Sequence, residues 1–139
     1  MTRSNRLSDM LVRHEGKRHL PYECGAGKIT IGVGRNLDDM GLTEEEIQFL
    51  LDNDIARCEQ ELNRFPWFRM MDEVRQDALI DLCFNMGLTR LLTFRRMIKA
   101  FEKRSWDQAA DELLDSRYSM QVGARSNEIA DMIRTGKYQ

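Results

Sequence analysis

The chain has 139 residues, of which 42% are hydrophobic and 32% charged, and it contains only two prolines. This composition excludes a disordered or fibrous protein, because enough apolar side chains are available to build a core. The net charge of −2 is the sum of +4 over residues 1–35, −8 over 36–63 and +2 over 64–139. We expect no nucleic-acid binding, because the cationic side chains form no concentrated patch interleaved with aromatic residues.

The N-terminal residues lead directly into a charged segment, and no apolar run approaches the roughly 18 residues needed to cross a bilayer. We therefore expect no signal peptide and no stable membrane association. The three cysteines, Cys24, Cys58 and Cys83, form neither a CxxC pair nor an even set. This pattern favours a reducing cytoplasm and gives no support to a metal site or a cofactor.

The first predicted element is an amphipathic helix. Leu7, Met10, Leu11 and His14 follow the i, i+3, i+4, i+7 spacing of one helical face, and the helix should end near Gly16.

A β-hairpin is predicted next, because the apolar pattern changes to a period of two. Residues 25–27 (Gly-Ala-Gly) predict the turn, and residues 28–34 predict a β-branched strand. Thr30, Gly32 and Gly34 share one face of this strand, which is nearly bare, while the other face is apolar. Two glycines in a strand indicate either the close approach of an extended ligand or a tight bend.

The rest of the chain is predicted to be helical. Thr43 and Glu46 match a capping box, and the apolar stripe that follows predicts a helix over about 44–63. Apolar repeats predict further helices, with breaks at 87–89, 105 and 116–124. We expect an α+β fold with a small N-terminal lobe at about 12–43, a connecting helix, and a helical C-terminal lobe at about 64–139. The first helix should pack near the C-terminal lobe.

One string of residues carries a resemblance. Glu15-Gly16 is followed by Cys24 after eight intervening residues and by Thr30 after five more, in the run Thr-Ile-Gly-Val-Gly. This pattern resembles the phage lysozymes of glycoside hydrolase family 24, which have Glu-Gly, then Asp or Cys, then Thr-Ile-Gly-x-Gly. Later segments also resemble the family, so the resemblance covers nearly the full chain: Phe84-Asn85-Met86-Gly87, Trp106, Ala109-Ala110, Arg117, Arg125 and Arg134-Thr135-Gly136.

The resemblance implies a single lysozyme-like domain that hydrolyses the β-1,4 bond between N-acetylmuramic acid and N-acetylglucosamine in bacterial peptidoglycan. It implies Glu15, Cys24 and Thr30 as catalytic residues. Glycoside cleavage needs a proton donor for the leaving oxygen and a second group that attacks or delivers water. Glu15 is the natural donor, and Thr30 can hold the water. Cys24 replaces the Asp of many members, and either covalent attack with retention or orientation of water with inversion is open to it.

The resemblance also implies supporting and substrate-binding residues. Arg125 is expected beside Glu15, where a guanidinium would position the carboxylate. Asn85 either contacts an acetamido group or caps a helix end, and Arg35 either forms an ion pair across the lobes or contacts the polymer. The full set is Gly32, Gly34, Arg35, Phe84, Asn85, Arg117 and Arg125.

These inferences predict a phage endolysin, acting as a monomer, that accumulates in the host cytoplasm. It would reach the wall from the periplasmic side through a separate, holin-type membrane lesion; delivery in a virion is the other route. Two other functions remain open from the sequence. A lytic transglycosylase also uses a lone Glu but closes an anhydro ring, and a non-catalytic module would bind peptidoglycan without cleaving it.

Overall fold

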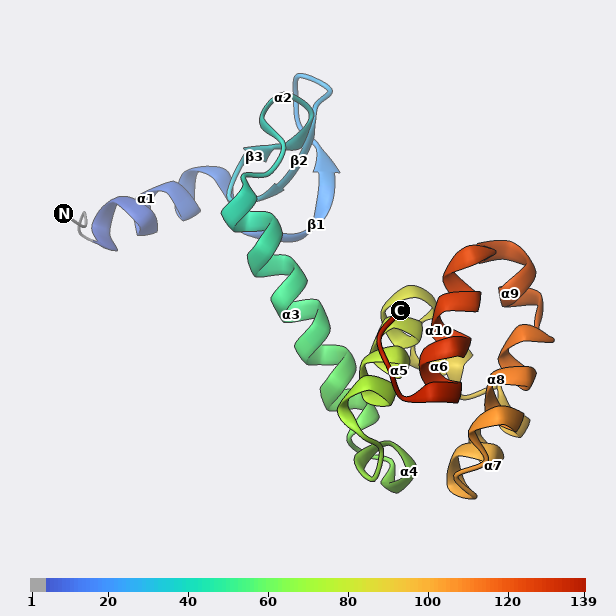
Figure 1. Ribbon diagram of the computed structural model, residues 1–139. Helices are drawn as coiled ribbons and strands as arrows, with labels where there is room; N and C mark the ends of the chain where they lie inside the picture. The colour runs from blue at the N-terminus through green and yellow to red at the C-terminus, as the bar shows by residue number, and fades with distance from the viewer. Residues whose placement is uncertain (1–4) are drawn as a thin grey trace. The chain divides into compact units, whose positions relative to one another are not determined.

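The computed structural model describes residues 5–139. Contacts divide the chain into two compact units, one ending at Phe49 and the other spanning Leu50–Gln139, with the boundary inside the long helix α3 (Glu44–Leu62). Among the described residues the strands belong to the first unit and helices predominate (Figure 1), which confirms the predicted α+β class. The packing of the first helix near the C-terminal lobe stays a prediction.

The first unit begins with helix α1 (Asn5–Glu15) and continues into a small antiparallel sheet. Gly16 ends α1, because its φ of 81° takes the backbone out of the helical region. The strands are β1 (Arg18–Glu23), β2 (Ile29–Gly32) and β3 (Arg35–Asn36), with β2 in the centre. A bulge in β1 holds Pro21, which is tolerated there because β1 is an edge strand.

Strand β2 is shorter than the predicted strand over residues 28–34. Gly32 and Gly34 have φ values of 69° and 71°, so the chain turns through Val33 and Gly34 into β3. The tight bend is therefore the structural reason for both glycines. The Thr30 side chain is only 3% exposed, whereas that of Ile29 on the apolar face is 41% exposed. The absence of side chains at Gly32 and Gly34 therefore does not leave Thr30 open to solvent.

Helix α2 (Leu37–Met40) and the start of α3 complete the first unit. The predicted capping box is confirmed: Thr43 Oγ1 accepts the N–H of Glu46 at 3.2 Å, and a Glu46 carboxylate oxygen accepts the N–H of Thr43 at 2.8 Å. These reciprocal bonds satisfy two N–H groups that a helix start otherwise leaves open. They place the first turn of α3 where the sequence pattern predicted it.

The second unit is a helical bundle. Every long helix predicted there is present, but two predicted breaks contain short helices. One helix begins at Leu88 within the break at 87–89. The other lies within the break at 116–124, because Ser116 accepts the N–H of Ser119 and caps it. No helix among the described residues has the length and apolarity to cross a membrane. The helices are α4 (Pro66–Arg69), α5 (Glu73–Met86), α6 (Leu88–Leu91), α7 (Arg95–Glu102), α8 (Trp106–Leu114), α9 (Arg117–Val122) and α10 (Ala124–Thr135).

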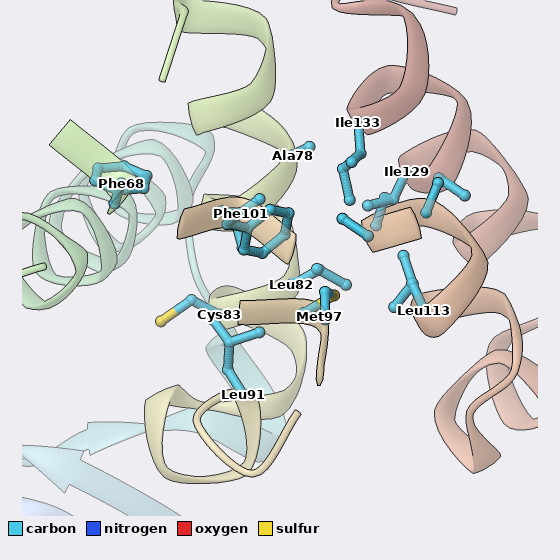
Figure 2. Close-up of a cluster of buried hydrophobic side chains, with 14 of the residues drawn as sticks. Phe68, Ala78, Leu82, Cys83, Leu91, Met97, Phe101, Leu113, Ile129 and Ile133 are labelled. Atoms are coloured by element: carbon cyan, nitrogen blue, oxygen red, sulfur yellow. The ribbon is translucent and has the colours of Figure 1, made fainter. Parts of the chain in front are cut away.

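A single apolar cluster holds the second unit together (Figure 2). Helix α5 contributes Leu82, α7 contributes Phe101 and α10 contributes Ile133, each at most 1% exposed. Burying side chains of this size stabilises a fold by about 1.5–3 kcal/mol each. The cluster extends through a row of aromatic rings in which Trp67 lies 5.5 Å from Phe101. The last turns of α3 join it through Cys58 and Leu62, which anchors that end of the helix in the second unit.

Candidate active site

Glu15 is the last residue of α1, and its side chain is exposed. A Cβ atom built on Gly34 would lie 2.9 Å from a carboxylate oxygen of Glu15, so this carboxylate rests directly against the β2–β3 turn. It has no hydrogen bond or ion pair within the described residues, which leaves its oxygens open to a substrate. The end of α1 and the glycine turn thus position the predicted proton donor together.

Cys24 begins the tight loop between β1 and β2. Its carbonyl accepts the N–H of Gly27 at 2.8 Å, and its N–H donates to the carbonyl of Lys28 at 2.9 Å. Residues at the first position of such turns are often Asp, because their side chain accepts the backbone N–H two positions later. Here the Cys24 sulfur is hydrogen-bonded by the N–H of Ala26, two positions later, and by that of Lys28. Turn geometry therefore favours an anionic acceptor at this position.

The surroundings of the Cys24 sulfur stabilise its thiolate form. The N–H of Lys28 is the largest cause, followed by the N–H of Ala26 and the hydroxyl of Thr30, and together they hold the pKa of this thiol below its usual value of 9.0. The Thr30 hydroxyl donates to the Lys28 carbonyl at 3.0 Å. The structure thus places Cys24 and Thr30 close together at one end of β2, while Glu15 lies against the turn at the other end.

Substitution of Gly34 tests this arrangement. Gly34→Ala adds a methyl group that overlaps the Glu15 carboxylate and a backbone strain of roughly 1 kcal/mol from the positive φ. Because a displacement of about 1 Å at a reacting group can cost about 10²-fold in rate, we expect a loss of hydrolysis near that size. The measurement is the rate of peptidoglycan clearing, with thermal melting as the check on folding.

Gly41→Ala is the matched control for Gly34→Ala. Gly41 also has a positive φ, of 59°, but a methyl group there has nothing within 4 Å and no contact with Glu15. Gly41→Ala should lower the melting temperature, but its rate of peptidoglycan clearing per folded molecule should equal that of the parent. Equal rates per folded molecule for the two variants would show that the approach of Gly34 to Glu15 has no role.

Arg35 forms an ion pair with Glu46 within the first unit. Its guanidinium donates to Glu46 with N···O distances of 2.8 and 2.6 Å and also to the carbonyl of Gly41. The paired guanidinium and the capping bonds of Thr43 lower the pKa of Glu46 to about 2. Of the two interpretations left open for Arg35, the structure thus gives an ion pair, although its partner starts the connecting helix and does not lie across the lobes.

The second unit presents a hollow of about 410 Å³ that contains two of the other predicted residues, Phe84 and Arg125. Arg125 donates to Asp81 at 2.9 Å from Nε and lies 2.8 Å from it through Nη2. The remaining lining is Leu51, Ile55, Asp77 and Ile80. The lining of the hollow is therefore mainly apolar, with a few charged side chains, which is typical of ligand-binding pockets.

The comparisons with known proteins agree with this architecture. The family model described as Phage lysozyme matches residues 12–131. The chain belongs to the phage lysozyme family. It is therefore a glycoside hydrolase that acts on peptidoglycan.

Several family relatives are curated proteins. Probable T4-type lysozyme 1 of Dictyostelium discoideum is 27% identical over 160 aligned positions, covering 94% of each chain. The Endolysin of Acyrthosiphon pisum secondary endosymbiont phage 1 is 33% identical over 91 positions, covering 60% of this chain and 59% of that protein. The SAR-endolysin of Haemophilus phage HP1 is 32% identical over 94 positions, covering 66% of this chain and 50% of that protein.

The other predicted residues of this phage-lysozyme chain lie in different places. Asn85 is exposed in the last turn of α5, next to Gly87, which ends the helix, and its side chain makes no hydrogen bond among the described residues. Arg117 begins α9 and lines a separate hollow beside α7. Phe84 and Arg125 share a pocket that Arg117 does not line, so the structure does not gather all the predicted second-unit residues into one pocket.

Asp81 is the residue that sequence reasoning missed. It binds the guanidinium of Arg125, and both side chains are partly exposed, at 44% and 39%. The two residues are 44 positions apart, so no local pattern signals the pair. An exposed pair of this kind contributes little stability, which makes orientation of Arg125 its main consequence.

Proposed function

We propose that the protein is a muramidase of glycoside hydrolase family 24, which cleaves the β-1,4 bond between N-acetylmuramic acid and N-acetylglucosamine. The main support is that the Cys24 thiol, whose pKa is lowered chiefly by the backbone N–H groups of Lys28 and Ala26, lies in the same unit as the unpartnered Glu15 carboxyl. A proton donor and a stabilised anion are the two groups that glycoside hydrolysis requires.

Glu15 gives its proton to the glycosidic oxygen as the bond from this oxygen to the anomeric carbon breaks. General acid assistance of this type contributes about 10²- to 10⁴-fold in rate. The absence of any hydrogen-bond partner for Glu15 within the described residues supports the role, because its carboxyl is then free to bond the substrate oxygen. The contact with Gly34 supplies the positioning that such a donor needs.

Cys24 acts on the opposite side of the reacting carbon. Its thiolate accepts a proton from a water molecule while the water oxygen forms the new bond to the anomeric carbon, so Glu15 ends deprotonated and Cys24 protonated. Exchange with solvent then restores both. In this role the sulfur forms no bond to carbon, so the configuration at the anomeric carbon is inverted.

The products test this proposal. Purified peptidoglycan should yield fragments with an ordinary reducing end, one water heavier than anhydro products, and proton NMR of the first product should show inversion at the anomeric carbon. Anhydro ends would identify a lytic transglycosylase and contradict the proposal. Retention would contradict the role of Cys24 but leave the bond assignment in place, and binding without cleavage would identify a non-catalytic module.

At the level of the cell, we propose that the protein acts as an endolysin on the bacterial wall, as the names of two of its relatives describe for those proteins. In this proposal it works as a monomer, leaves the host cytoplasm through a holin-type membrane lesion and reaches peptidoglycan in the periplasm. Arg125 would position Glu15, and Phe84, Asn85 and Arg117 would contact the polymer, with Gly32, Gly34 and Arg35 maintaining the turn beside it.

A further inference from the structure

The second unit has a hollow of about 450 Å³ between the start of α7 and the start of α9. Four arginines line it: Arg90, Arg95, Arg96 and Arg117. Two carboxylates, Glu112 and Asp115, are also present, but none of the four arginines has an ion pair with them or with another carboxylate within the described residues. Arg90 donates to the Gln121 side chain at 3.3 Å and lies over the Tyr118 ring, so the excess positive charge that is open to a ligand comes mainly from Arg95, Arg96 and Arg117.

The start of α7 adds to this positive potential. Arg95 and Arg96 are its first two residues, and the first turn contains no acidic side chain. The N-cap residue, Phe94, makes no side-chain hydrogen bond to the turn. The N-terminus of a helix carries a partial positive charge and open N–H groups, and cations there are unfavourable. A bound anion would accept hydrogen bonds from open N–H groups and would offset the positive charge of the two arginines.

This conflict between local sequence and helix stability is informative. Helix starts normally carry Ser, Thr, Asp or Asn as N-cap and acidic residues in the first turn, as Asp72 and Glu73 do at α5. At α7 both devices are missing and two cations replace them. Helix α10 also lacks both devices and has Arg125 in its first turn, but there Arg125 is paired with Asp81. The first-turn arginines of α7 have no ion pair among the described residues, which leaves them for a ligand.

The chemistry of the hollow indicates its ligand. Guanidinium groups form paired hydrogen bonds with phosphate oxygens, and several of them around one hollow match an anion with more than one acceptor oxygen. A single-stranded nucleic acid would also need aromatic surfaces for its bases. The aromatic residues here are Phe94, which is partly buried, and Tyr118, which is 2% exposed and covered by Arg90. The lining thus offers contacts for phosphate groups but no stacking platform.

We propose that this hollow binds the phosphodiester groups of an anionic glycopolymer of the bacterial wall, which would hold the enzyme on the surface that it digests. The anion site itself rests on the arginines and the start of α7. Only the source of the polymer rests on the proposed function. Arg117, which is proposed above to contact the peptidoglycan, would also contact phosphate groups from this hollow.

The test is isothermal titration of the full chain with poly(glycerol phosphate), in low salt, for the parent and for the double variant Arg95→Gln/Arg96→Gln. We expect the double variant to bind about tenfold more weakly or worse, because two charge-assisted contacts are lost. Its melting temperature should stay equal or rise, because the removed cations oppose the helix dipole. Parental affinity should fall steeply with added salt, as it does for other contacts with phosphate polymers.

Lys99→Gln/Lys103→Gln is the matched control. It removes the same charge from the same helix and its C-cap, at exposed positions that do not line the hollow. Its affinity should stay within about twofold of the parent. Glu112→Gln tests the opposite direction, because removal of a carboxylate from the lining should tighten binding by about two- to threefold.

Three results would overturn the inference. Equal losses in the two double variants would mean that only overall charge matters. Absence of binding by the parent would remove the site, and binding of oligothymidylate as tightly as the glycerol phosphate polymer would assign it to nucleic acid. Titration measures binding without hydrolysis. A protein that binds poly(glycerol phosphate) but releases no reducing ends from peptidoglycan would therefore refute the proposed muramidase function and leave this site intact.

Discussion

Glu15→Gln should reduce hydrolysis of peptidoglycan by about 10³-fold or more while leaving the fold unchanged. The amide has the shape of the carboxyl group but cannot give up a proton to the glycosidic oxygen. Since the Glu15 carboxylate is exposed and has no partner in the described residues, its replacement removes no structural hydrogen bond. Release of reducing ends measures the rate, and thermal melting measures stability.

Asp9→Asn is the control for this substitution. It removes a carboxylate from the same helix, at an exposed position that no proposed step uses. The control should hydrolyse peptidoglycan at the parental rate. If Glu15→Gln and Asp9→Asn cleared peptidoglycan equally well, Glu15 would not be the proton donor. The proposed muramidase mechanism would then lack its acid.

Cys24→Ser should reduce hydrolysis by about 10²-fold or more. A serine hydroxyl fits the turn and accepts the N–H of Ala26, but it does not ionise in the accessible pH range, so no anion remains to accept the proton of water. The melting temperature should change little. A variant as active as the parent would show that the Cys24 sulfur only completes the turn.

Cys24→Asp should keep hydrolysis near the parental rate and shift its dependence on pH. The turn favours Asp at this position, and a carboxylate is ionised above a pKa of about 3.9. Cys24 has its pKa lowered by the N–H groups of Lys28 and Ala26 and by Thr30, but from 9.0, so the fraction of thiolate still increases as the pH rises through that lowered value. The acid limb of kcat/KM against pH should therefore lie at lower pH in Cys24→Asp than in the parent.

The anomeric outcome links these two variants. Parent and Cys24→Asp should both invert, because in each an anion accepts the proton of water without bonding to carbon. An unshifted acid limb in Cys24→Asp would contradict the thiolate as the titrating group. A retaining parent with an inverting Asp variant would instead establish covalent attack by the sulfur.

The long helices were predictable because their signals are local. The capping box of Thr43 and Glu46 places the start of α3, and apolar side chains at helical spacing mark α5, α7, α8 and α10. The turn between β1 and β2 was also predictable from its glycines. Each signal lies within a few residues of the element that it specifies, so a single pass along the chain finds it.

The short helices and the end of β2 were less accessible to sequence reasoning. Helix α9 has a Ser116 cap, but its six residues are too few to show a helical period. Strand β2 continues an alternating pattern past its end, and only the positive φ values of Gly32 and Gly34 stop it. A glycine permits such a conformation without requiring it, so the sequence alone left a bend and a ligand contact as alternatives.

By itself, the sequence determined the fold class, the family, and the identity of Glu15, Cys24 and Thr30 as the candidates for chemistry. Only the tertiary structure decided that Thr30 is buried against Cys24, that Gly34 supports Glu15, that Asp81 holds Arg125, and that arginines of α6, α7 and α9 share one hollow. The physical reason is the separation in sequence between the residues that interact. Caps and periodic patterns act between neighbours in the chain, whereas these contacts join separate elements, and the packing of those elements decides which side chains meet.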